Sequence, residues 1–157
     1  MSSTQSRDQL LRALNLEFRA VSANSVMFSQ TVAEKVGMHP TDNESLDFLL
    51  LNGASTAGQL AKMTGLTTGA VTAMIDRLEK AGYVRREHDQ ADRRRVIVIP
   101  NEEKIYRDIS PHTAPMGAAL LKVSEAFSDE ELEIVRRFMA KANEAATAVI
   151  GQTKTEK

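Results

Sequence analysis

The chain has 157 residues, of which 42% are apolar and 26% charged, and its formal net charge at pH 7 is −1. It contains no cysteine, which excludes disulfides, cysteine zinc sites and thiolate nucleophiles. No apolar run approaches the ~20 residues of a membrane-spanning helix, and the polar start MSSTQSRDQ lacks the apolar centre of a signal peptide. We therefore expect a cytoplasmic chain that forms one domain over residues 1–157, with no membrane contact.

Residues 8–37 predict a long helix. Their apolar positions recur at steps of three and four residues from Leu10 and Leu14 onward, and Gly37 ends the pattern. A helix of this length has more apolar surface than one small folded unit can cover, so we expect a partner to pack against it.

A second helix is predicted from Thr41 to Asn52. Thr41 and Glu44 form a capping pattern, in which each side chain satisfies a main-chain N–H group at the start of a helix. Gly53 ends this helix. We expect it to brace the two helices that follow, as the first member of a three-helix unit.

Two helices joined by a tight turn are predicted within residues 56–81. Thr56 and Gln59 form another capping pattern, Gly65 ends the first of the two helices, and Thr67 can cap the next helix at once. A turn of three residues therefore separates the two helices.

The helix over residues 67–81 has two contrasting faces. Apolar residues fall on one side at 3.6-residue spacing, namely Val71, Met74, Ile75 and Leu78. The opposite side carries Thr68, Gly69, Thr72, Ala73, Asp76 and Arg77. Because this face has no large apolar side chain, the helix can approach another molecule closely, as a recognition helix does in the DNA major groove. The same residues also suit an ordinary solvated face, and this helix alone does not decide between the two interpretations.

A basic β-hairpin is predicted next, with strands over Tyr83–His88 and Arg95–Pro100 and the polar turn DQADRR between them. Residues 77–95 contain seven basic and four acidic side chains, although the whole chain has a net charge of −1. This concentration of positive charge favours nucleic-acid binding.

Two further helices are predicted after the hairpin. Asn101 can cap the first, whose pattern is interrupted by Pro111 and Pro115, so we expect a kinked or divided helix. Ser128 with Glu131 caps the last helix, which should end near Gly151.

The run AVTAMIDRLEKAGYVRREHDQADRRRVIV resembles the winged helix-turn-helix core of the MarR family of bacterial transcriptional regulators. The resemblance includes the family's wing signature, here Asp92, Arg93 and Arg94, and covers roughly residues 55–100. It implies a mainly α fold with a small β-hairpin wing, in which residues 40–100 form the DNA-binding region.

The resemblance also implies a homodimer whose interface is built from the terminal helices, over residues 8–37 and 102–150. The residues expected at this interface are Leu10, Leu14, Leu132, Val135, Phe138 and Met139. Two recognition helices related by a two-fold axis could read half-sites roughly 34 Å apart in a palindromic operator. The alternative is that the terminal helices pack only on each other within one chain.

The residues expected to contact double-stranded DNA, by resemblance and by facing, are Ser55, Thr56, Thr67, Thr68, Gly69, Ala70, Thr72, Ala73, Arg77, Arg93, Arg94 and Arg95. Helix 67–81 should enter the major groove, and the wing over residues 83–99 should reach the minor groove. Arg94 matches the family's wing-tip arginine, and Asp76 and Asp92 are expected to orient it. Many relatives have a polar residue where this chain has Ala73, so one direct base contact is in doubt.

Regulation in the family often involves a small aromatic or apolar anion that binds between the dimerisation helices and the winged unit. The side chains that could line such a site are Met27, Phe28, His39, Phe48 and Tyr106, each of which could equally belong to the core.

No catalytic function is expected. The chain contains neither GxGxxG nor a phosphate-binding loop, and its three histidines stand singly in different segments, so no cofactor and no metal site is predicted. The second functional hypothesis is a winged module for protein interaction or DNA architecture without strong sequence preference.

Overall fold

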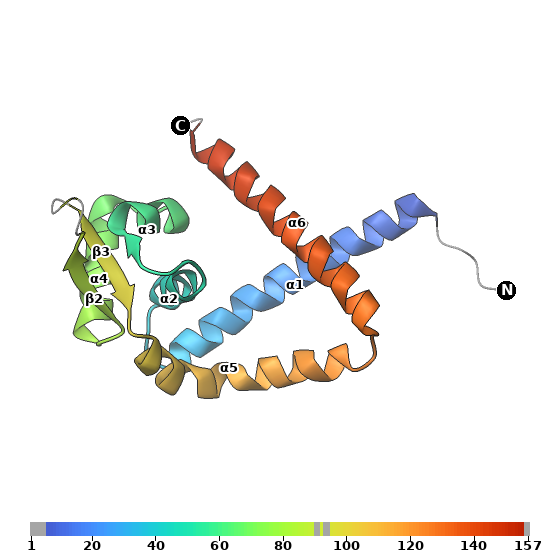
Figure 1. Ribbon diagram of the computed structural model, residues 1–157, viewed down its shortest axis with the longest axis horizontal. Helices are drawn as coiled ribbons and strands as arrows, with labels where there is room; N and C mark the ends of the chain where they lie inside the picture. The colour runs from blue at the N-terminus through green and yellow to red at the C-terminus, as the bar shows by residue number, and fades with distance from the viewer. Residues whose placement is uncertain (1–5, 90–91, 93–94, 156–157) are drawn as a thin grey trace. The chain divides into compact units, whose positions relative to one another are not determined.

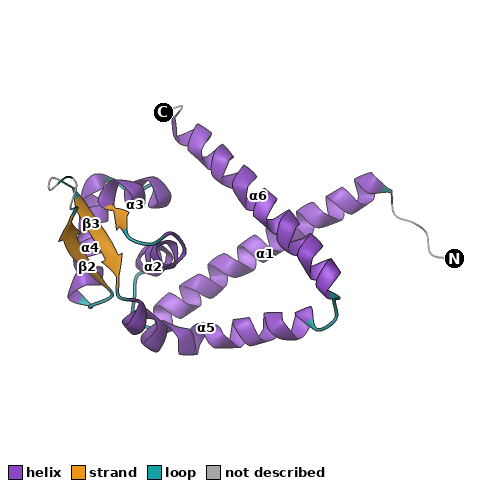
Figure 2. Cartoon of the chain, in the orientation of Figure 1, coloured by secondary structure: helices purple, strands orange, loops and turns teal. Residues whose placement is uncertain are grey.

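The computed structural model describes residues 6–89, 92 and 95–155, with the backbone alone for 153–155. The chain divides into two compact units, Met1–Thr113 and Ala114–Lys157, with the boundary inside a helix. Among the described residues, no helix is long and apolar enough to cross a membrane. The fold is mainly helical with one small sheet, as the sequence predicts (Figures 1 and 2).

The first unit contains five helices, the last of which continues beyond it, and a three-stranded antiparallel sheet with the order β1-β3-β2. Its elements are α1 (Arg7–Lys35), α2 (Pro40–Asn52), β1 (Ser55–Thr56), α3 (Ala57–Thr64), α4 (Thr68–Lys80), β2 (Val84–His88), β3 (Val96–Pro100) and the start of α5 (Glu102–Ser124). The core lies between these helices and the sheet and includes Val32, Leu46, Leu49, Leu60, Val71, Met74, Ile75, Leu78, Val84, Val98, Ile105 and Ile109.

The long first helix is confirmed as α1. Ser6 and Gln9 form a capping box at its start, and Gly37, with φ of 67°, follows its end. Val32, near its C-terminus, is buried in the core, whereas Leu10 and Leu14 are exposed. Figure 1 shows α1 extending well away from the sheet and the short helices of the first unit.

The second helix starts two residues earlier than the predicted Thr41 cap allows. His39 is the N-cap, and its Nδ1 accepts the N–H of Thr41 at 3.3 Å. Pro40 occupies the first helical position. The main-chain N–H of a residue at this position has no acceptor within the helix, so proline, which lacks that N–H, loses no hydrogen bond there. The predicted Thr41–Glu44 capping pattern is therefore wrong, because the ring of Pro40 already favours the helical φ at that residue.

The helix-turn-helix segment forms as the sequence predicts. Thr56 and Gln59 make both reciprocal bonds of a capping box before α3. Gly65 adopts the left-handed conformation with φ of 74°, and Thr67 caps α4 directly afterwards. These contacts hold the two helices at a fixed mutual angle with a linker of only three residues.

Strand β1 is an element that the sequence did not predict. Ser55 pairs with Val98 and Thr56 with Ile97, on the side of β3 opposite to β2. A two-residue strand has no periodicity of its own, and its partner lies about 40 residues away, so no local signal marks it. It ties the start of α3 to the base of the hairpin.

Of the two outcomes expected from Pro111 and Pro115, a kinked or a divided helix, division is wrong, because α5 runs without interruption from Glu102 to Ser124. A proline removes a single N–H donor, and the buried Ile105 and Ile109 anchor the helix just before Pro111. In the second unit α6 (Asp129–Thr155) begins at the predicted Ser128–Glu131 capping box and extends four residues past Gly151.

Candidate nucleic-acid interface

Helix α4 has the two faces that its sequence predicts. Val71, Met74, Ile75 and Leu78 are buried against the core, and Thr68, Gly69, Thr72 and Ala73 are exposed on the opposite side. A Cβ atom added at Gly69 would meet no atom within 4 Å, so packing within the chain does not require a small residue there. The outer face is therefore open to close approach by another molecule.

The N-terminus of α4 presents hydroxyl groups beside its free main-chain N–H groups. Thr67 Oγ1 accepts the N–H of Ala70 at 3.4 Å, and Thr72 Oγ1 donates to the carbonyl of Thr68 at 3.0 Å. The partial positive charge at a helix N-terminus attracts anions such as phosphate groups. This end of α4 can contact a phosphate backbone while its outer face lies against base edges.

Ser55, one of the residues expected to contact DNA, does not present its hydroxyl to a ligand. The residue is 3% exposed, and its Oγ donates to the carbonyl of Gly53 at 3.1 Å. Its place in β1 turns it toward the core, which the sequence did not reveal. Thr56 is half-buried, and its hydroxyl is already bonded to Gln59. The expected contact through the Ser55 hydroxyl is therefore wrong.

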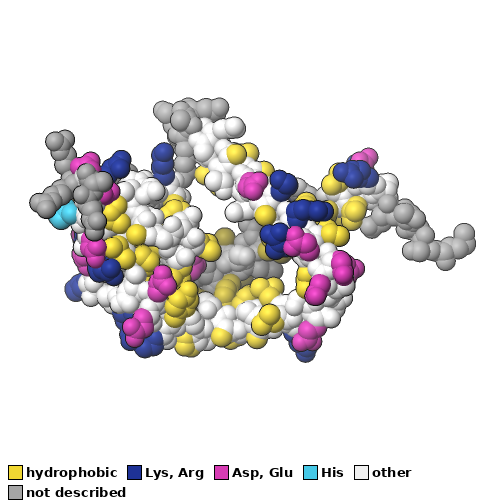
Figure 3. All heavy atoms as spheres, in the orientation of Figure 1, with side chains coloured by type: hydrophobic (Ala, Val, Ile, Leu, Met, Phe, Trp, Pro, Cys, Tyr) yellow, Lys and Arg dark blue, Asp and Glu magenta, His cyan; other side chains and the backbone are white. Residues whose placement is uncertain are grey.

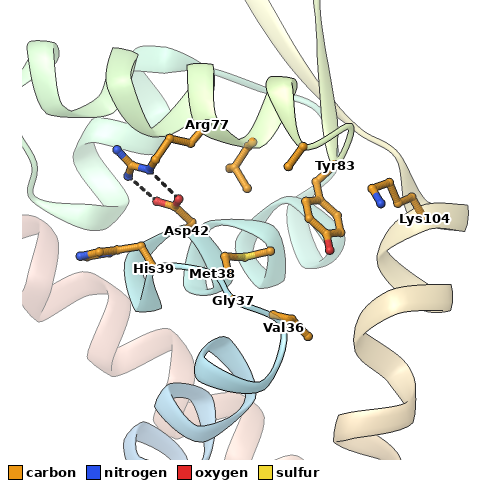
Figure 4. A pocket seen from close by; sticks show the side chains of 10 residues that line it. Val36, Gly37, Met38, His39, Asp42, Arg77, Tyr83 and Lys104 are labelled. Carbon is orange, nitrogen blue, oxygen red and sulfur yellow. Dashed lines mark hydrogen bonds and ion pairs between the residues drawn. The ribbon is translucent and has the colours of Figure 1, made fainter.

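Arg77 joins α4 to α2. Its Nε and Nη2 donate to the two carboxylate oxygens of Asp42 at 2.8 and 2.6 Å (Figure 4). The Asp42 side chain is 4% exposed, and its hydrogen bond raises the pKa of Arg77 above the ordinary arginine value. Arg77 was expected to contact DNA, and its bond to Asp42 was not predicted from the sequence.

Arg86, which the sequence analysis did not select, joins the wing to α4. Its Nη2 lies 2.5 Å from Asp76 Oδ1, and its Nη1 and main-chain N–H both donate to Glu79. Burial lowers the pKa of Arg86, but the hydrogen bonds to Asp76 and Glu79 raise it more, so the net pKa lies above the ordinary value. Asp76 thus contacts the wing through Arg86.

The hairpin is closed by main-chain bonds near its tip. Asp89 N–H donates to the Arg95 carbonyl at 3.0 Å, and Arg95 N–H donates to the Asp92 carbonyl at 2.8 Å. Arg95 and Asp92 are exposed. Arg93 and Arg94 lie outside the described residues, so the minor-groove role of Arg94 and its orientation by Asp76 and Asp92 stay predictions.

Several basic side chains counted in residues 77–95 form ion pairs within the chain. Arg77 pairs with Asp42, Arg85 pairs with Glu87 at 2.7 Å, and Arg86 pairs with two acids of α4. Among the described residues of this segment, these three arginines are therefore engaged within the chain and are less available to phosphates.

The five residues expected to line an effector site differ in their surroundings. Met27 and Tyr106 are exposed, and Phe28 and Phe48 pack against the core. His39 alone of the five lines a cavity of about 280 Å³ in the first unit, together with Val36, Gly37, Met38, Asp42, Arg77, Leu78, Ala81, Tyr83 and Lys104 (Figure 4). This cavity was not predicted, because it forms where the bend after α1 brings the start of α2 opposite the end of α4, and no sequence pattern indicates that bend.

Asp108 anchors the start of α5 beside this cavity. Its Oδ2 accepts from Lys104 Nζ at 2.5 Å and from the Tyr83 hydroxyl at 3.3 Å, and Lys104 Nζ lies 4.6 Å from the centre of the Tyr83 ring. Hydrogen bonds from Lys104 and Arg107 lower the pKa of Asp108, whereas burial, followed by the charge of Asp108, raises the pKa of Tyr83.

The substitution Asp108→Asn is expected to lower the melting temperature at pH 7 and to have a smaller effect near pH 3. The pKa of Asp108 is lower in the folded chain, so its carboxylate stabilises the fold above the unfolded pKa of about 3.9. That contribution is lost as the pH falls through the folded pKa. Thermal melting of both proteins between pH 7 and about pH 3 tests this, and a difference that persists undiminished at the lowest pH would contradict it.

The terminal helices expose the apolar residues expected at a dimer interface. Leu10 and Leu14 of α1 and Val135, Phe138 and Met139 of α6 are exposed in the single chain, and Leu132 is half-buried. Figure 3 shows hydrophobic side chains at the surface of these helices. Among the residues that the structure describes, no group of three or more acidic or histidine side chains could hold a metal ion.

Comparisons with known proteins agree on one family. A family model described as the MarR family matches residues 37–95. The HTH-type transcriptional regulator YcgE of Bacillus subtilis is 42% identical over 144 residues, which cover 90% of this chain and 92% of that protein.

Two solved structures show the same fold. A MarR family protein from Bacillus stearothermophilus is 26% identical with a TM-score of 0.68, over 91% of this chain and 99% of that one. Sco3205, a MarR family transcriptional regulator from Streptomyces coelicolor solved in complex with DNA, is 20% identical with a TM-score of 0.57, over 91% and 94% of the two chains.

Proposed function

The chain belongs to the MarR family of transcriptional regulators, and from this premise we propose that it acts in the cytoplasm as a homodimeric repressor of transcription. In this proposal each chain places α4 in the major groove of one half of a roughly palindromic operator. The wing over residues 83–99 reaches the adjacent minor groove, with Arg94 at its tip.

The observation that carries the proposal is the outer face of α4. Thr68, Gly69, Thr72 and Ala73 are exposed together, and none has a large side chain that would keep the helix away from base edges. Threonine can hydrogen-bond several bases, and the methyl of Ala73 can contact a thymine methyl. Sco3205, which shares the fold, was solved bound to DNA.

Selection of bound sequences from a random duplex library, repeated at two salt concentrations, tests this function. A repressor should recover a palindrome, and its affinity should fall steeply with salt because phosphate contacts release counterions. Salt-dependent binding without any recovered motif would instead favour the second candidate, an architectural or protein-interaction module. Failure to bind any duplex would remove the proposed DNA-binding role.

The dimer proposal rests on the apolar residues that α1 and α6 expose. Val135→Glu should raise the dissociation constant of the dimer at least about tenfold, because a carboxylate would be buried in an apolar interface. Sedimentation at several protein concentrations measures this effect. Leu51→Glu is the matched control, since Leu51 of α2 is 85% exposed and lies outside the terminal helices. A Val135→Glu variant that sediments like the control would argue against an interface at α6.

We also propose that a small aromatic or otherwise apolar anion regulates the dimer. The cavity of about 280 Å³ beside His39 supports this, because it lies between the end of α4 and the start of α5. A ligand that binds one separation of the two recognition helices better than another shifts their population. A panel of phenolic acids that changes neither the melting temperature nor the operator affinity would count against this regulation.

A further inference from the structure

Arg86 lies on the inner face of the wing. In the register of the sheet it stands opposite Val98 of β3, which in turn pairs with Ser55 of β1. Val98 and Ser55 are buried, and Val84, two residues before Arg86 on the same strand, is buried as well. Because side chains alternate along a strand, Arg86 points to the same side as these residues, toward α4.

Three hydrogen bonds join Arg86 to α4. The guanidinium donates to Asp76 and to Glu79, and the main-chain N–H donates to the other carboxylate oxygen of Glu79 at 3.0 Å. A guanidinium can hold two carboxylates in a fixed planar geometry, which lysine cannot do. The Arg86 and Glu79 side chains are 28% and 39% exposed, so their contact is less screened by water than that of the outward-facing Arg85 and Glu87.

The two acids of α4 are unfavourable for DNA binding when considered alone. Asp76 and Glu79 are neighbours of like charge on one side of the helix, and Glu79 lies in its last turn, where the helix dipole disfavours a carboxylate. Both also add negative charge to the helix proposed to approach phosphates. Their hydrogen bonds to Arg86 offset the unfavourable electrostatic energy of the two carboxylates.

We propose that Arg86, Asp76 and Glu79 form a clamp that fixes the angle between the recognition helix and the wing. The proposal rests on the DNA-binding function proposed above, since a repressor must place α4 and the wing in adjacent grooves at the same time. A clamp that holds this geometry before binding removes the ordering cost from the association. Arg86 is then a positioning residue, and its charge is used inside the protein instead of on a phosphate.

Glu79→Gln gives the sharpest test, because the clamp and simple electrostatics predict opposite signs. Loss of one negative charge should strengthen binding to DNA by long-range electrostatics alone. The clamp requires Glu79→Gln to weaken operator binding about tenfold, since one amide oxygen replaces two carboxylate oxygens. Glu87→Gln is the matched control, because it removes the same charge from an exposed pair on the outer face of β2 and should not weaken binding.

A double-substitution cycle completes the test. Arg86→Gln and Glu79→Gln should each weaken operator binding, and the double variant should bind no worse than the weaker single variant. When bound to the operator, the Arg86→Gln variant should still protect guanine N7 in the major groove from chemical modification, but it should no longer protect adenine N3 in the minor groove. Reduced stability of the fold would weaken protection in both grooves together.

The clamp is overturned if Glu79→Gln binds the operator as tightly as the wild type or more tightly, or if the two single effects multiply. It is also overturned if Arg86→Gln leaves both grooves protected as in the wild type. All affinities are measured well below each melting temperature. If the wild-type protein recovers no operator at all, the proposed function fails instead.

Discussion

Replacing Thr72 by glutamate is expected to lower operator affinity at least about a hundredfold without a large change in melting temperature. Thr72 is exposed at the centre of the outer face of α4, and its hydroxyl bonds only locally, to the carbonyl of Thr68. A carboxylate there would repel phosphates and replace a base contact of the kind that contributes about 1–3 kcal/mol. Fluorescence anisotropy with labelled operator at one fixed salt concentration measures the loss.

Thr72→Ser is the control for this substitution, because it keeps the hydroxyl in place and removes one methyl group. It should retain most of the affinity, apart from any contact that the methyl makes with a thymine methyl. If Thr72→Glu still binds operator like the wild type, the outer face of α4 does not lie in the major groove.

Replacing Met74 by alanine should lower the free energy of unfolding by about 2–5 kcal/mol. Met74 is 0% exposed on the inner face of α4, and its Sδ accepts the hydroxyl of Ser45 at 2.9 Å. The substitution leaves a cavity and deprives that hydroxyl of one acceptor, although Ser45 keeps its bond to the carbonyl of Thr41. Urea denaturation at a fixed protein concentration measures the change, because the stability of a dimer depends on concentration.

Met74→Leu is the control, since a swap that conserves volume usually costs less than about 1.5 kcal/mol. A loss below about 1 kcal/mol in Met74→Ala would mean that the inner face of α4 is not packed as described. Thr72 and Met74 stand two residues apart on opposite faces, so one substitution changes binding and the other changes stability.

The parts of the fold that could be predicted are those encoded by neighbouring residues. Helix α4 follows from the Thr67 cap and the 3.6-residue spacing of Val71, Met74 and Leu78. The hairpin follows from a β-branched run and a polar turn, and the start of α6 from Ser128 and Glu131. Each of these signals lies within a few residues in the sequence, and each element was found in the structure.

The contacts that escaped prediction join residues distant in the sequence. Asp42 and Arg77 are 35 residues apart, and Ser55 pairs with a strand about 40 residues away, so neither partner marks the other locally. The inward direction of Arg86 depends on the strand register, which a one-residue shift would reverse. The positive charge of Arg86 could therefore be read from the sequence, but its contacts with Asp76 and Glu79 could not.

The proposed function depends on sequence-specific recognition of DNA by a dimer. The most direct test is to compare the equilibrium affinity for the selected operator with that for a scrambled duplex of equal length and base composition, at physiological salt. We expect a preference of about a thousandfold or more, with two chains bound per operator. A ratio near one, or a single chain bound at saturation, would contradict it.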